Sequence, residues 1–498
     1  MTRSSREIRY QGLAQAGQGL FWLGLVFCLA WSITIPVSAN EAGIGKAAAS
    51  DHQNVADDFH GGQQVLAPPS GAENIENFSA QLYRKLQLNL PVVAAMDEES
   101  GQLLFTHERD QLHAIASLTK LLAVYVLEDA LADGKITLDT KVPVSPEVAA
   151  LSRESDLSNV PLVASKDRYT VDELLDAVLV SSGNAATVAL GELLAPDEAS
   201  FVQLMRDKLD ELGLKDYEMY TASGINTDYG LGDIKKQDRK ENKLTASGLL
   251  DLVQHLLKTY PDLRERTRLT HVDFAVDDQN SLLARNSNEF LPDGLYARAG
   301  VTGVKTGTEQ EAGYCLVSEV EISGRKILLV SLGAGTHDQL YQETGRLIDA
   351  LDEELTWVPL VKQGEVYLSR DNIQIYQGMR ANVDLVYGED QGVFLPNGQH
   401  FEAEVWQKPT EKFSYAPNGK LQVEAPLATD QPVNHVKTQL DFVSNRQGQP
   451  LELVSSLVPS QNVEELPLVL RVTNRMNNLL DKVWEKFQQT FNTGPAGS

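Results

Sequence analysis

The spacing of apolar and polar residues changes along the chain and predicts three successive kinds of structure. In the first, helix-like stretches lie between strand-like runs. The predicted helices are 118–131, 171–180, 185–194, 201–212, 245–259 and 344–355. The predicted strands are 91–96, 101–105, 303–307, 314–322 and 326–332, with Ser323-Gly324 as a hairpin turn. This order predicts an α+β domain over residues 78–357, with helices packed on a mainly antiparallel sheet.

After about residue 357, short runs alternate apolar and polar positions, at 366–368, 373–376, 383–387 and 421–423. Turn residues separate these runs, which is typical of a small all-β domain. We therefore predict a β-sandwich over residues 358–462.

The last segment, residues 463–498, has helical periodicity with one apolar face. Trp484 lies beside that face, and Arg471, Arg475, Lys482 and Lys486 fall on or near the other. Such an amphipathic helix can lie in a membrane interface, or it can pack on a protein partner or on its own domain. We expect a membrane-associating helix and keep the packed helix as the alternative.

The N-terminus has the composition of an export signal. Basic residues precede the apolar stretch 19–35, and Pro36-Val37-Ser38-Ala39 offers a cleavage site after Ala39. We predict a signal peptide over 1–39 and a flexible spacer over 40–77, with a retained anchor helix as the alternative. Either way the protein is expected outside the cytoplasm, on the outer face of the cytoplasmic membrane or in the cell envelope.

Length and charge narrow the functional classes. A chain of 498 residues suggests two or three folded units. Its formal net charge of −26 argues against a nucleic-acid partner. Of the two cysteines, Cys28 would leave with the signal peptide, and Cys315 is expected to be a small buried hydrophobe.

Ser117-Leu118-Thr119-Lys120 is the first candidate for chemistry. On a helix, residues three apart share a face, so the Lys120 amine can reach the Ser117 hydroxyl. The apolar surroundings would lower the pKa of Lys120 and supply a base for the serine. The pattern alone is weak, because Ser323-Gly324-Arg325-Lys326 fits it too and lies in a predicted turn.

Two further motifs strengthen this interpretation. Ser182-Gly183-Asn184 separates two predicted helices, although it could simply cap the second one. Lys305-Thr306-Gly307-Thr308 lies on a predicted strand and could bind a carboxylate, although it could equally be an exposed edge-strand lysine before a bulge.

In this order the three motifs resemble those of the penicillin-recognising serine enzymes. The flanking sequences narrow the resemblance to the low-molecular-mass D-alanyl-D-alanine carboxypeptidases. These sequences are Ile115-Ala116 before Ser117, Ser223-Gly224-Ile225-Asn226, and Ala312-Gly313-Tyr314 after the Lys-Thr-Gly motif. The resemblance is strong over about 85–355 and less specific in the β-domain and the terminal helix.

The resemblance implies a penicillin-sensitive carboxypeptidase that acts on peptidoglycan stem peptides and binds β-lactams. Ser117 would attack the penultimate D-Ala carbonyl, Lys120 would be its base, and Ser182 would relay a proton to the leaving D-Ala. Asn184 would hold the substrate amide, and Lys305 and Thr306 the terminal carboxylate.

The backbone N–H groups of Ser117 and Thr308 would form the oxyanion hole, and Gly307 would let the stem peptide pair with the strand edge. No metal or other cofactor is implied, and no His-Glu-x-x-His pattern occurs in the sequence.

Two positions depart from the family pattern. Ala185 follows Asn184, where many members have Asp. Many members also carry an Arg that assists carboxylate binding, and the matching stretch 333–343 has none. Arg298 is a candidate substitute.

Three other functions compete with the carboxypeptidase. A β-lactamase in its commonest form needs a carboxylate to activate water, and no Glu-x-x-x-Asn lies between Ser182 and Lys305. A DD-transpeptidase shares the acylation machinery and differs in the acceptor. A catalytically weak wall-binding protein would keep the fold, but would have no physical need for Lys120 beside Ser117.

Overall fold

The computed structural model of the chain describes residues 64–66, 75–398, 403–405, 407–416, 418–445 and 447–491. The predicted signal peptide lies outside these residues, as does most of the predicted spacer. Within that spacer, β1 (Gln64–Leu66) pairs with β19 (Ala403–Val405), and α1 (Ile75–Leu86) begins three residues before the predicted boundary at 78. The helix belongs to the first domain, because Phe78 and Leu82 are buried in its core and Ile75 packs against that core.

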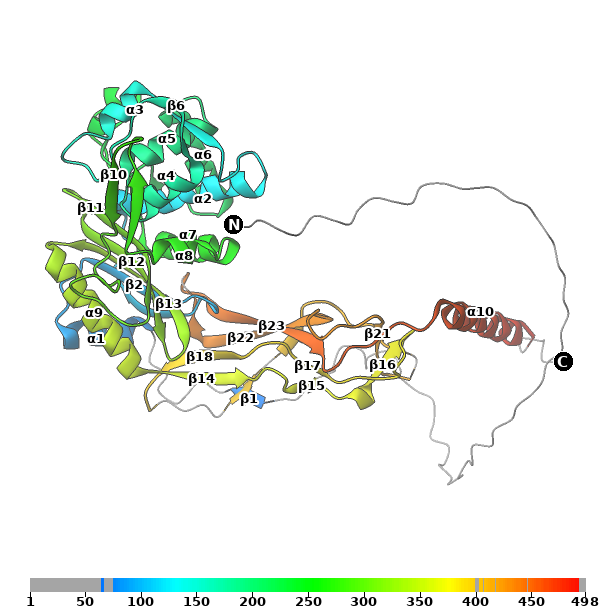
Figure 1. The fold of residues 1–498 in the computed structure, drawn as a ribbon. Helices are drawn as coiled ribbons and strands as arrows, with labels where there is room; N and C mark the ends of the chain where they lie inside the picture. Colours follow the sequence, from blue (N-terminus) through cyan, green and yellow to red (C-terminus); the bar gives the residue numbers. More distant parts are fainter. Residues whose placement is uncertain are drawn as a thin grey trace, which may run out of the picture. The chain divides into compact units, whose positions relative to one another are not determined.

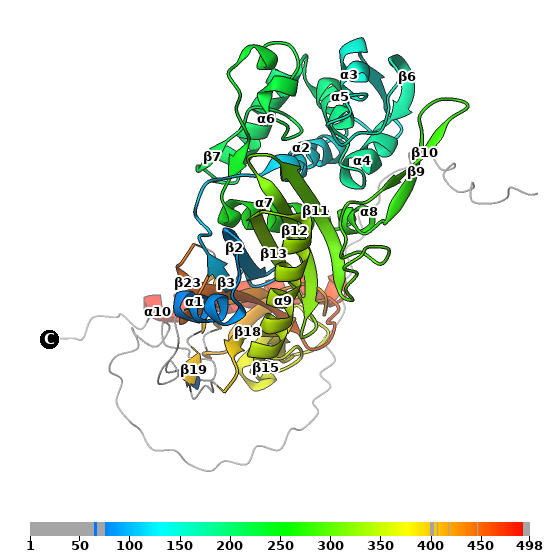
Figure 2. The same cartoon turned by 90° about the vertical axis from the view of Figure 1, so that its left-hand side faces the viewer.

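A five-stranded antiparallel sheet is the centre of this domain (Figures 1 and 2). Its order is β11-β12-β13-β2-β3. The bounds are β2 (Val92–Asp97), β3 (Leu103–His107), β11 (Val301–Glu309), β12 (Gly313–Ile322) and β13 (Arg325–Ala334). The predicted mixture of helices with a mainly antiparallel sheet is confirmed.

Alternate residues of the sheet belong to two different cores. In β2, Val93 and Ala95 pack in the cluster that includes α1 and α9 (His337–Glu354), whereas Ala94 and Met96 pack with α2 (Thr119–Ala132) and α7 (Ala246–Thr259). This period of two is expected for strands covered by helices on both faces. Helix α9 begins seven residues before the predicted start at 344, because Thr336 caps it by accepting a hydrogen bond from the Gln339 N–H.

The remaining elements of this domain lie mainly between β3 and β11 in the sequence, and several helices gather at the top of Figure 1. The helices are α3 (Pro146–Leu151), α4 (Val171–Leu179), α5 (Asn184–Leu194), α6 (Glu198–Glu211) and α8 (Leu263–Thr267). The short strands are β4 (His113–Ala114), β5 (Lys141–Val144), β6 (Ser165–Thr170), β7 (Tyr217–Glu218), β8 (Lys243–Leu244), β9 (His271–Ala275) and β10 (Ser281–Arg285). Cys315 in β12 is fully buried, as predicted, and burial raises the pKa of its thiol to about 12.

From Leu355 to Pro459 the described elements are strands and one short 3-10 turn. Besides β19, they are β14 (Leu355–Val361), β15 (Val366–Leu368), β16 (Ile373–Tyr376), β17 (Leu385–Tyr387), β18 (Gln391–Pro396), β20 (Gln407–Pro409), β21 (Leu421–Glu424), β22 (Asn434–Ser444) and β23 (Pro450–Pro459). Five of them form a sheet in the order β15-β17-β23-β22-β20. The two-layered sandwich over 358–462 stays a prediction.

The last helix, α10 (Leu468–Phe491), exposes a row of large apolar side chains. They are Leu468, Val469, Leu470, Val472, Met476, Leu479, Leu480, Val483 and Trp484. Within the described residues, no helix combines the length and the apolar character needed to cross a membrane.

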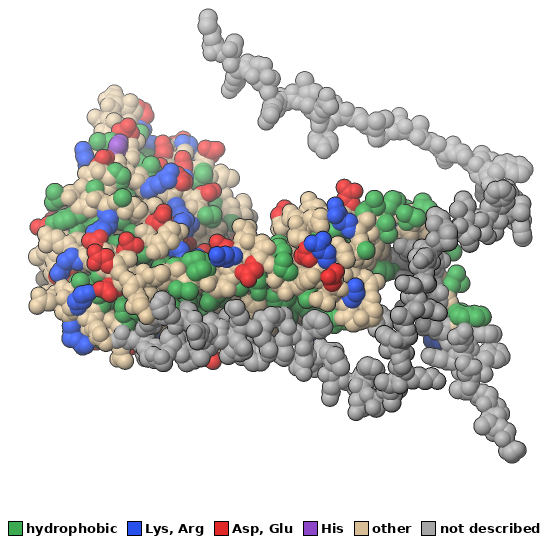
Figure 3. All heavy atoms as spheres, turned by 90° about the horizontal axis from the view of Figure 1, so that it is seen from below, with side chains coloured by type: hydrophobic (Ala, Val, Ile, Leu, Met, Phe, Trp, Pro, Cys, Tyr) green, Lys and Arg blue, Asp and Glu red, His purple; other side chains and the backbone are tan. Residues whose placement is uncertain are grey.

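Acidic and basic side chains are intermingled on the face of the molecule in Figure 3. On this face the negative net charge is therefore not gathered into one patch.

Candidate active site

Ser117 lies in a 3-10 turn, η1 (Ala116–Leu118), that leads directly into α2. Ala116 has a φ of 46°, an uncommon conformation for a residue with a side chain. Two glycines allow other segments to approach this turn. A Cβ on Gly224 would lie 1.9 Å from the Ala116 carbonyl oxygen, and one on Gly307 would lie 2.9 Å from that of Ile115.

The position of Gly307 changes the expectation for that residue. Its missing side chain faces the protein's own Ile115 and Leu118, not a space for the stem peptide. Gly307 therefore serves the close packing of β11 against the turn that carries Ser117.

Lys120 is fully buried one helical turn after Ser117. Its Nζ lies 2.8 Å from Ser117 Oγ, 2.7 Å from Asn184 Oδ1 and 2.7 Å from the carbonyl oxygen of Ser223. Burial, and then the charge of Lys305, place the pKa of Lys120 well below its usual value. The predicted contact between Lys120 and Ser117 is present.

The partners of Lys120 define what its amine can do when it is neutral. A neutral amine has two N–H donors and one lone pair. Asn184 Oδ1 and the Ser223 carbonyl oxygen can only accept hydrogen bonds. When they accept both N–H donors, the lone pair is left for the Ser117 hydroxyl, which can donate. The arrangement fits a general base for Ser117.

The second motif joins α4 to α5 and faces the same lysine. Asn184 also donates from Nδ2 to the Ser158 carbonyl oxygen at 3.0 Å, which fixes the orientation of its amide. Ser182 is 5 % exposed with a φ of 61°, and its hydroxyl makes no hydrogen bond to another described residue. The motif does supply the N-cap of α5, at Gly183, but no side chain makes a capping hydrogen bond there, so the Ser182 hydroxyl does not cap the helix.

Lys305 lies on β11, the edge strand of the sheet, with its side chain directed inward. It is 2 % exposed, so the alternative of an exposed edge-strand lysine is also wrong. Burial lowers the pKa of Lys305 to about 7. In the described part of the chain its amine donates one hydrogen bond, to the Thr306 carbonyl oxygen at 3.1 Å, while the Thr306 hydroxyl bonds to that of Ser287.

A cleft of about 470 Å³ brings these motifs to one surface. Residues from all three motifs line it, together with the segment after Ser223 and the start of β12. They are Ser117, Asp156, Leu157, Ser158, Asn184, Gly224, Ile225, Asn226, Tyr229, Arg239, Thr308, Glu309, Gln310, Gly313, Tyr314 and Gly335.

Arg298 is not the missing carboxylate-binding arginine. Its guanidinium pairs with Asp349 and donates to the Gly345 carbonyl oxygen, both on α9. Gly335 lines the cleft inside the stretch that lacks Arg, and a Cβ there would meet only Gln339 Oε1, at 3.3 Å. The second Ser-x-x-Lys begins in the exposed turn Ser323-Gly324, as predicted, but its Arg325 and Lys326 already belong to β13.

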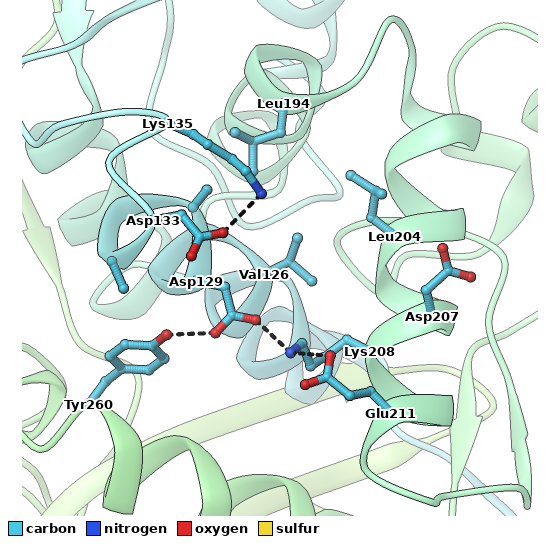
Figure 4. A pocket seen from close by; sticks show the side chains of 12 residues that line it. Val126, Asp129, Asp133, Lys135, Leu194, Leu204, Asp207, Lys208, Glu211 and Tyr260 are labelled. Atoms are coloured by element: carbon cyan, nitrogen blue, oxygen red, sulfur yellow. Dashed lines mark hydrogen bonds and ion pairs between the residues drawn. The ribbon is translucent and has the colours of Figure 1, made fainter.

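Figure 4 shows a different hollow, of about 680 Å³, lined by side chains of α2 and α6 among others. Most of its charged groups are already paired with one another, and Asp207 accepts a hydrogen bond from Gln203. Lys208 lies 2.6 Å from both Asp129 and Glu211, and the Tyr260 hydroxyl donates to Asp129 at 2.6 Å. Ser117 does not line this hollow, so we assign no chemistry to it.

The backbone partners of the site were missing from the sequence-based prediction. The Ser223 carbonyl holds Lys120, the Ser158 carbonyl holds Asn184, and Asn159 Oδ1 accepts from the Ala185 N–H. The Ser223-Gly224-Ile225-Asn226 sequence was the one available signal for the first of these. Nothing in the sequence around Ser158 indicates the others.

The fold and site define a serine hydrolase in which a buried lysine serves the nucleophile. Residues 84–336 match the D-alanyl-D-alanine carboxypeptidase family, peptidase S11. The chain belongs to this family.

Individual relatives agree with the family assignment. The chain is 25 % identical to D-alanyl-D-alanine carboxypeptidase DacF of Bacillus subtilis over 61 % of this chain and 72 % of the relative. It is also 25 % identical to D-alanyl-D-alanine carboxypeptidase DacC of Escherichia coli, over 80 % of this chain and 88 % of the relative.

Two solved structures share the fold. A peptidoglycan synthesis regulatory factor (PBP3) from Streptococcus pneumoniae has a TM-score of 0.65 at 28 % identity, covering 76 % of this chain and 100 % of the other. Penicillin binding protein 5 from Haemophilus influenzae has a TM-score of 0.53 at 26 % identity, covering 76 % and 98 %.

Proposed function

We propose that this D-alanyl-D-alanine carboxypeptidase works through a Ser117 acyl-enzyme and removes the terminal D-alanine of peptidoglycan stem peptides. The observation that carries the proposal is the set of three partners around the Lys120 amine, which fits a neutral base aimed at Ser117.

In the acylation step, Ser117 Oγ attacks the carbonyl carbon of the penultimate D-Ala while its proton passes to Lys120 Nζ. The backbone N–H groups of Ser117 and Thr308 stabilise the resulting oxyanion. The carbon–nitrogen bond to the terminal D-Ala then breaks, and its amine takes the proton through the Ser182 hydroxyl. Water hydrolyses the Ser117 ester and restores the enzyme.

The substrate lies along the free edge of β11, because β11 has only β12 as a neighbour in its sheet. The terminal carboxylate is held by Lys305 and Thr306, and the acyl carbonyl lies beside Thr308. Asn184 lines the cleft, but its Oδ1 and Nδ2 already bind Lys120 and Ser158, so we assign it mainly to orienting the base.

Labelled penicillin tests the assignment of the nucleophile. A β-lactam amide mimics the D-Ala-D-Ala bond, so we expect one label per chain, mapped by peptide mass spectrometry to the peptide that contains Ser117. Label that persists in Ser117→Ala would contradict the assignment. A free D-amino acid added as acceptor distinguishes hydrolysis from transpeptidation, because an exchanged peptide would form only if the acyl-enzyme accepts amines.

We further propose that the protein is exported and that α10 lies on the membrane surface through its exposed apolar residues. Removing residues 468–498 should move the protein from the membrane fraction to the soluble fraction while it still cleaves small peptides. The deletion should be made in a chain whose N-terminal 39 residues are replaced by a cleavable signal. Unchanged fractionation would show that α10 packs on a protein instead.

A further inference from the structure

Asn242 is a buried residue whose side chain contacts two other segments of the catalytic domain. It immediately precedes β8 and is 1 % exposed, and it does not line the cleft that contains Ser117. Any effect of Asn242 on the reaction is therefore transmitted by the residues that it contacts.

The Asn242 amide uses all four of its hydrogen-bonding positions. Its Oδ1 accepts from the backbone N–H groups of Tyr220 at 2.7 Å and of Thr221 at 3.1 Å. Its Nδ2 donates to the Thr221 carbonyl oxygen at 2.8 Å and to Thr119 Oγ1 at 3.2 Å. Because Oδ1 faces two donors, exchanging the amide oxygen and nitrogen would set donors against donors, so the orientation of the amide is fixed.

These contacts join the helix that carries the base to the loop that contacts the base. Thr119 is the first residue of α2 and directly precedes Lys120. Thr221 lies two residues before Ser223, whose carbonyl oxygen accepts from Lys120 Nζ at 2.7 Å. Asn242 therefore links the two segments whose separation determines the contact between the Lys120 amine and the Ser223 carbonyl.

The loop depends on side chains for support, because residues 219–226 form no helix or strand. Three consecutive backbone N–H groups of the loop donate to side chains of distant residues. Asn242 accepts from Tyr220 and Thr221, and Glu198 accepts from Ala222 at 3.0 Å. Thr221 is fully buried, so loss of the Asn242 side chain would leave its N–H group without this acceptor and away from water. We expect the loop to shift until the group regains a partner.

We propose that Asn242 is a positioning residue for the catalytic base, because it keeps the Ser223 carbonyl oxygen against the Lys120 amine. With both acceptors in place, the neutral amine directs its lone pair to Ser117. Without the Ser223 carbonyl, one N–H of Lys120 is free to turn towards Ser117 Oγ, and the lone pair then points away from the proton that it must take. This inference rests on the proposed function and adds to it a residue outside the three motifs.

The test measures how fast labelled penicillin acylates the full-length chain and its Asn242→Ala variant over a range of penicillin concentrations. The limiting rate constant should fall about ten- to a hundredfold, as expected when a reacting group is misplaced by a change outside the site. The penicillin concentration that gives half of this rate should change little, since Asn242 does not line the cleft. A merely structural role would lower the fraction of chains that become labelled and leave the rate constant of the folded chains unchanged.

A buried asparagine of the β-domain provides the matched control. Asn434 is 6 % exposed, its Oδ1 accepts from the backbone N–H groups of Glu411 and His435, and its Nδ2 donates to the Glu411 carbonyl oxygen. Asn434→Ala should lower the melting temperature, as Asn242→Ala does, but should acylate at the wild-type rate.

A second comparison asks whether Asn242 acts through the base. In a Lys120→Met background, Asn242→Ala should slow acylation by less than about twofold, because the group that Asn242 positions is already absent. A further tenfold loss in that background would overturn the proposal. If Asn242→Ala does not fold, Thr119→Val takes its place, since it removes one of the four hydrogen bonds and keeps the shape of the side chain. Thr119→Val should slow acylation about three- to tenfold, and only when Lys120 is present.

The outcomes separate this role from the proposed function. Acylation at the wild-type rate by Asn242→Ala, or by Thr119→Val if the first variant is unfolded, would overturn the positioning role and leave the carboxypeptidase intact. A wild-type chain that penicillin does not label would contradict the proposed function and this role together.

Discussion

The two buried lysines of the Ser-x-x-Lys and Lys-Thr-Gly motifs, Lys120 and Lys305, are held in different ways. Lys120 has three partners within 2.8 Å, two of which can only accept hydrogen bonds. Lys305 is just as deeply buried, yet within the described residues its amine donates one hydrogen bond, to the neighbouring Thr306 carbonyl oxygen at 3.1 Å.

Under the proposed function, this difference distinguishes a base that is already oriented from a cation that binds the substrate carboxylate. The surroundings of Lys120 complete its coordination before substrate arrives and aim its lone pair at Ser117. Lys305 keeps unused donors, which suits a group whose partner is a substrate carboxylate. Burial lowers the pKa of both amines. In the proposed mechanism, the lower pKa of Lys120 makes the neutral base accessible, and the lower pKa of Lys305 would make carboxylate binding sensitive to pH.

The largest expected effect comes from removing the base. Lys120→Met should slow acylation by labelled penicillin roughly a thousandfold, within the range for loss of a general base. Labelling reactions quenched at a series of times measure the acylation rate, and the melting temperature shows whether the variant is folded. Lys326→Met, in the second Ser-x-x-Lys, is the control and should label at the wild-type rate. Acylation of Lys120→Met within tenfold of the wild type would contradict the assignment of the base.

Removing the carboxylate partner should have a smaller effect. Lys305→Ala should lower kcat/KM for a D-Ala-D-Ala peptide by about a hundredfold, since the substrate carboxylate then enters the cleft unpaired. The loss should be smaller for the same peptide with a C-terminal amide, which carries no charge. An equal loss on both peptides would show that Lys305 acts on the reaction in some other way.

The pH dependence sharpens the contrast between the lysines. With a pKa of about 7, Lys305 is charged below pH 7 and neutral above it. For the free enzyme, kcat/KM should therefore fall as pH rises through about 7, because the charged amine is the form that binds carboxylate. In Lys305→Arg this alkaline limb should move to much higher pH, since guanidinium stays charged. A limb that stays near pH 7 in the variant would have another cause.

The smallest expected effect is an improvement in substrate binding. Gly335→Arg should lower KM for a D-Ala-D-Ala peptide about three- to tenfold by placing a second cation at the carboxylate end of the cleft. A side chain can be placed there if Gln339 shifts slightly, because a Cβ would meet only Gln339 Oε1, at 3.3 Å, which accepts a hydrogen bond from the Gly335 N–H. Gly335→Ala adds the Cβ without the charge and should leave KM unchanged. If both variants behave alike, the missing Arg is irrelevant to binding.

Local sequence predicted the parts of the site that depend on helical spacing. Ser117 and Lys120 meet because residues three apart on a helix share a face, and the Ser-x-x-Lys motif has this spacing. The antiparallel pairing of β12 and β13 followed equally well from two strand-like runs joined by the Ser323-Gly324 turn. The predicted start of α9 is seven residues late, although the Thr336 cap and the buried Leu340 and Tyr341 mark its first turns.

What the sequence could not predict depends on contacts between distant segments. The Ser223 carbonyl reaches Lys120 only because Gly224 lets its loop close on Ala116. Every residue has a backbone carbonyl, so a sequence motif cannot indicate which carbonyl contacts Lys120. In the same way, Gly307 faces Ile115 and Arg298 pairs with Asp349, and neither contact follows from local pattern.

The most direct test of the account measures D-alanine release from a peptide ending in D-Ala-D-Ala by the full-length chain and by Ser117→Ala. We expect release by the wild-type chain and none by the variant, with the peptidyl ester trapped on Ser117 when the reaction is quenched early. Release that continues in Ser117→Ala would contradict the central claim that Ser117, served by Lys120, is the nucleophile.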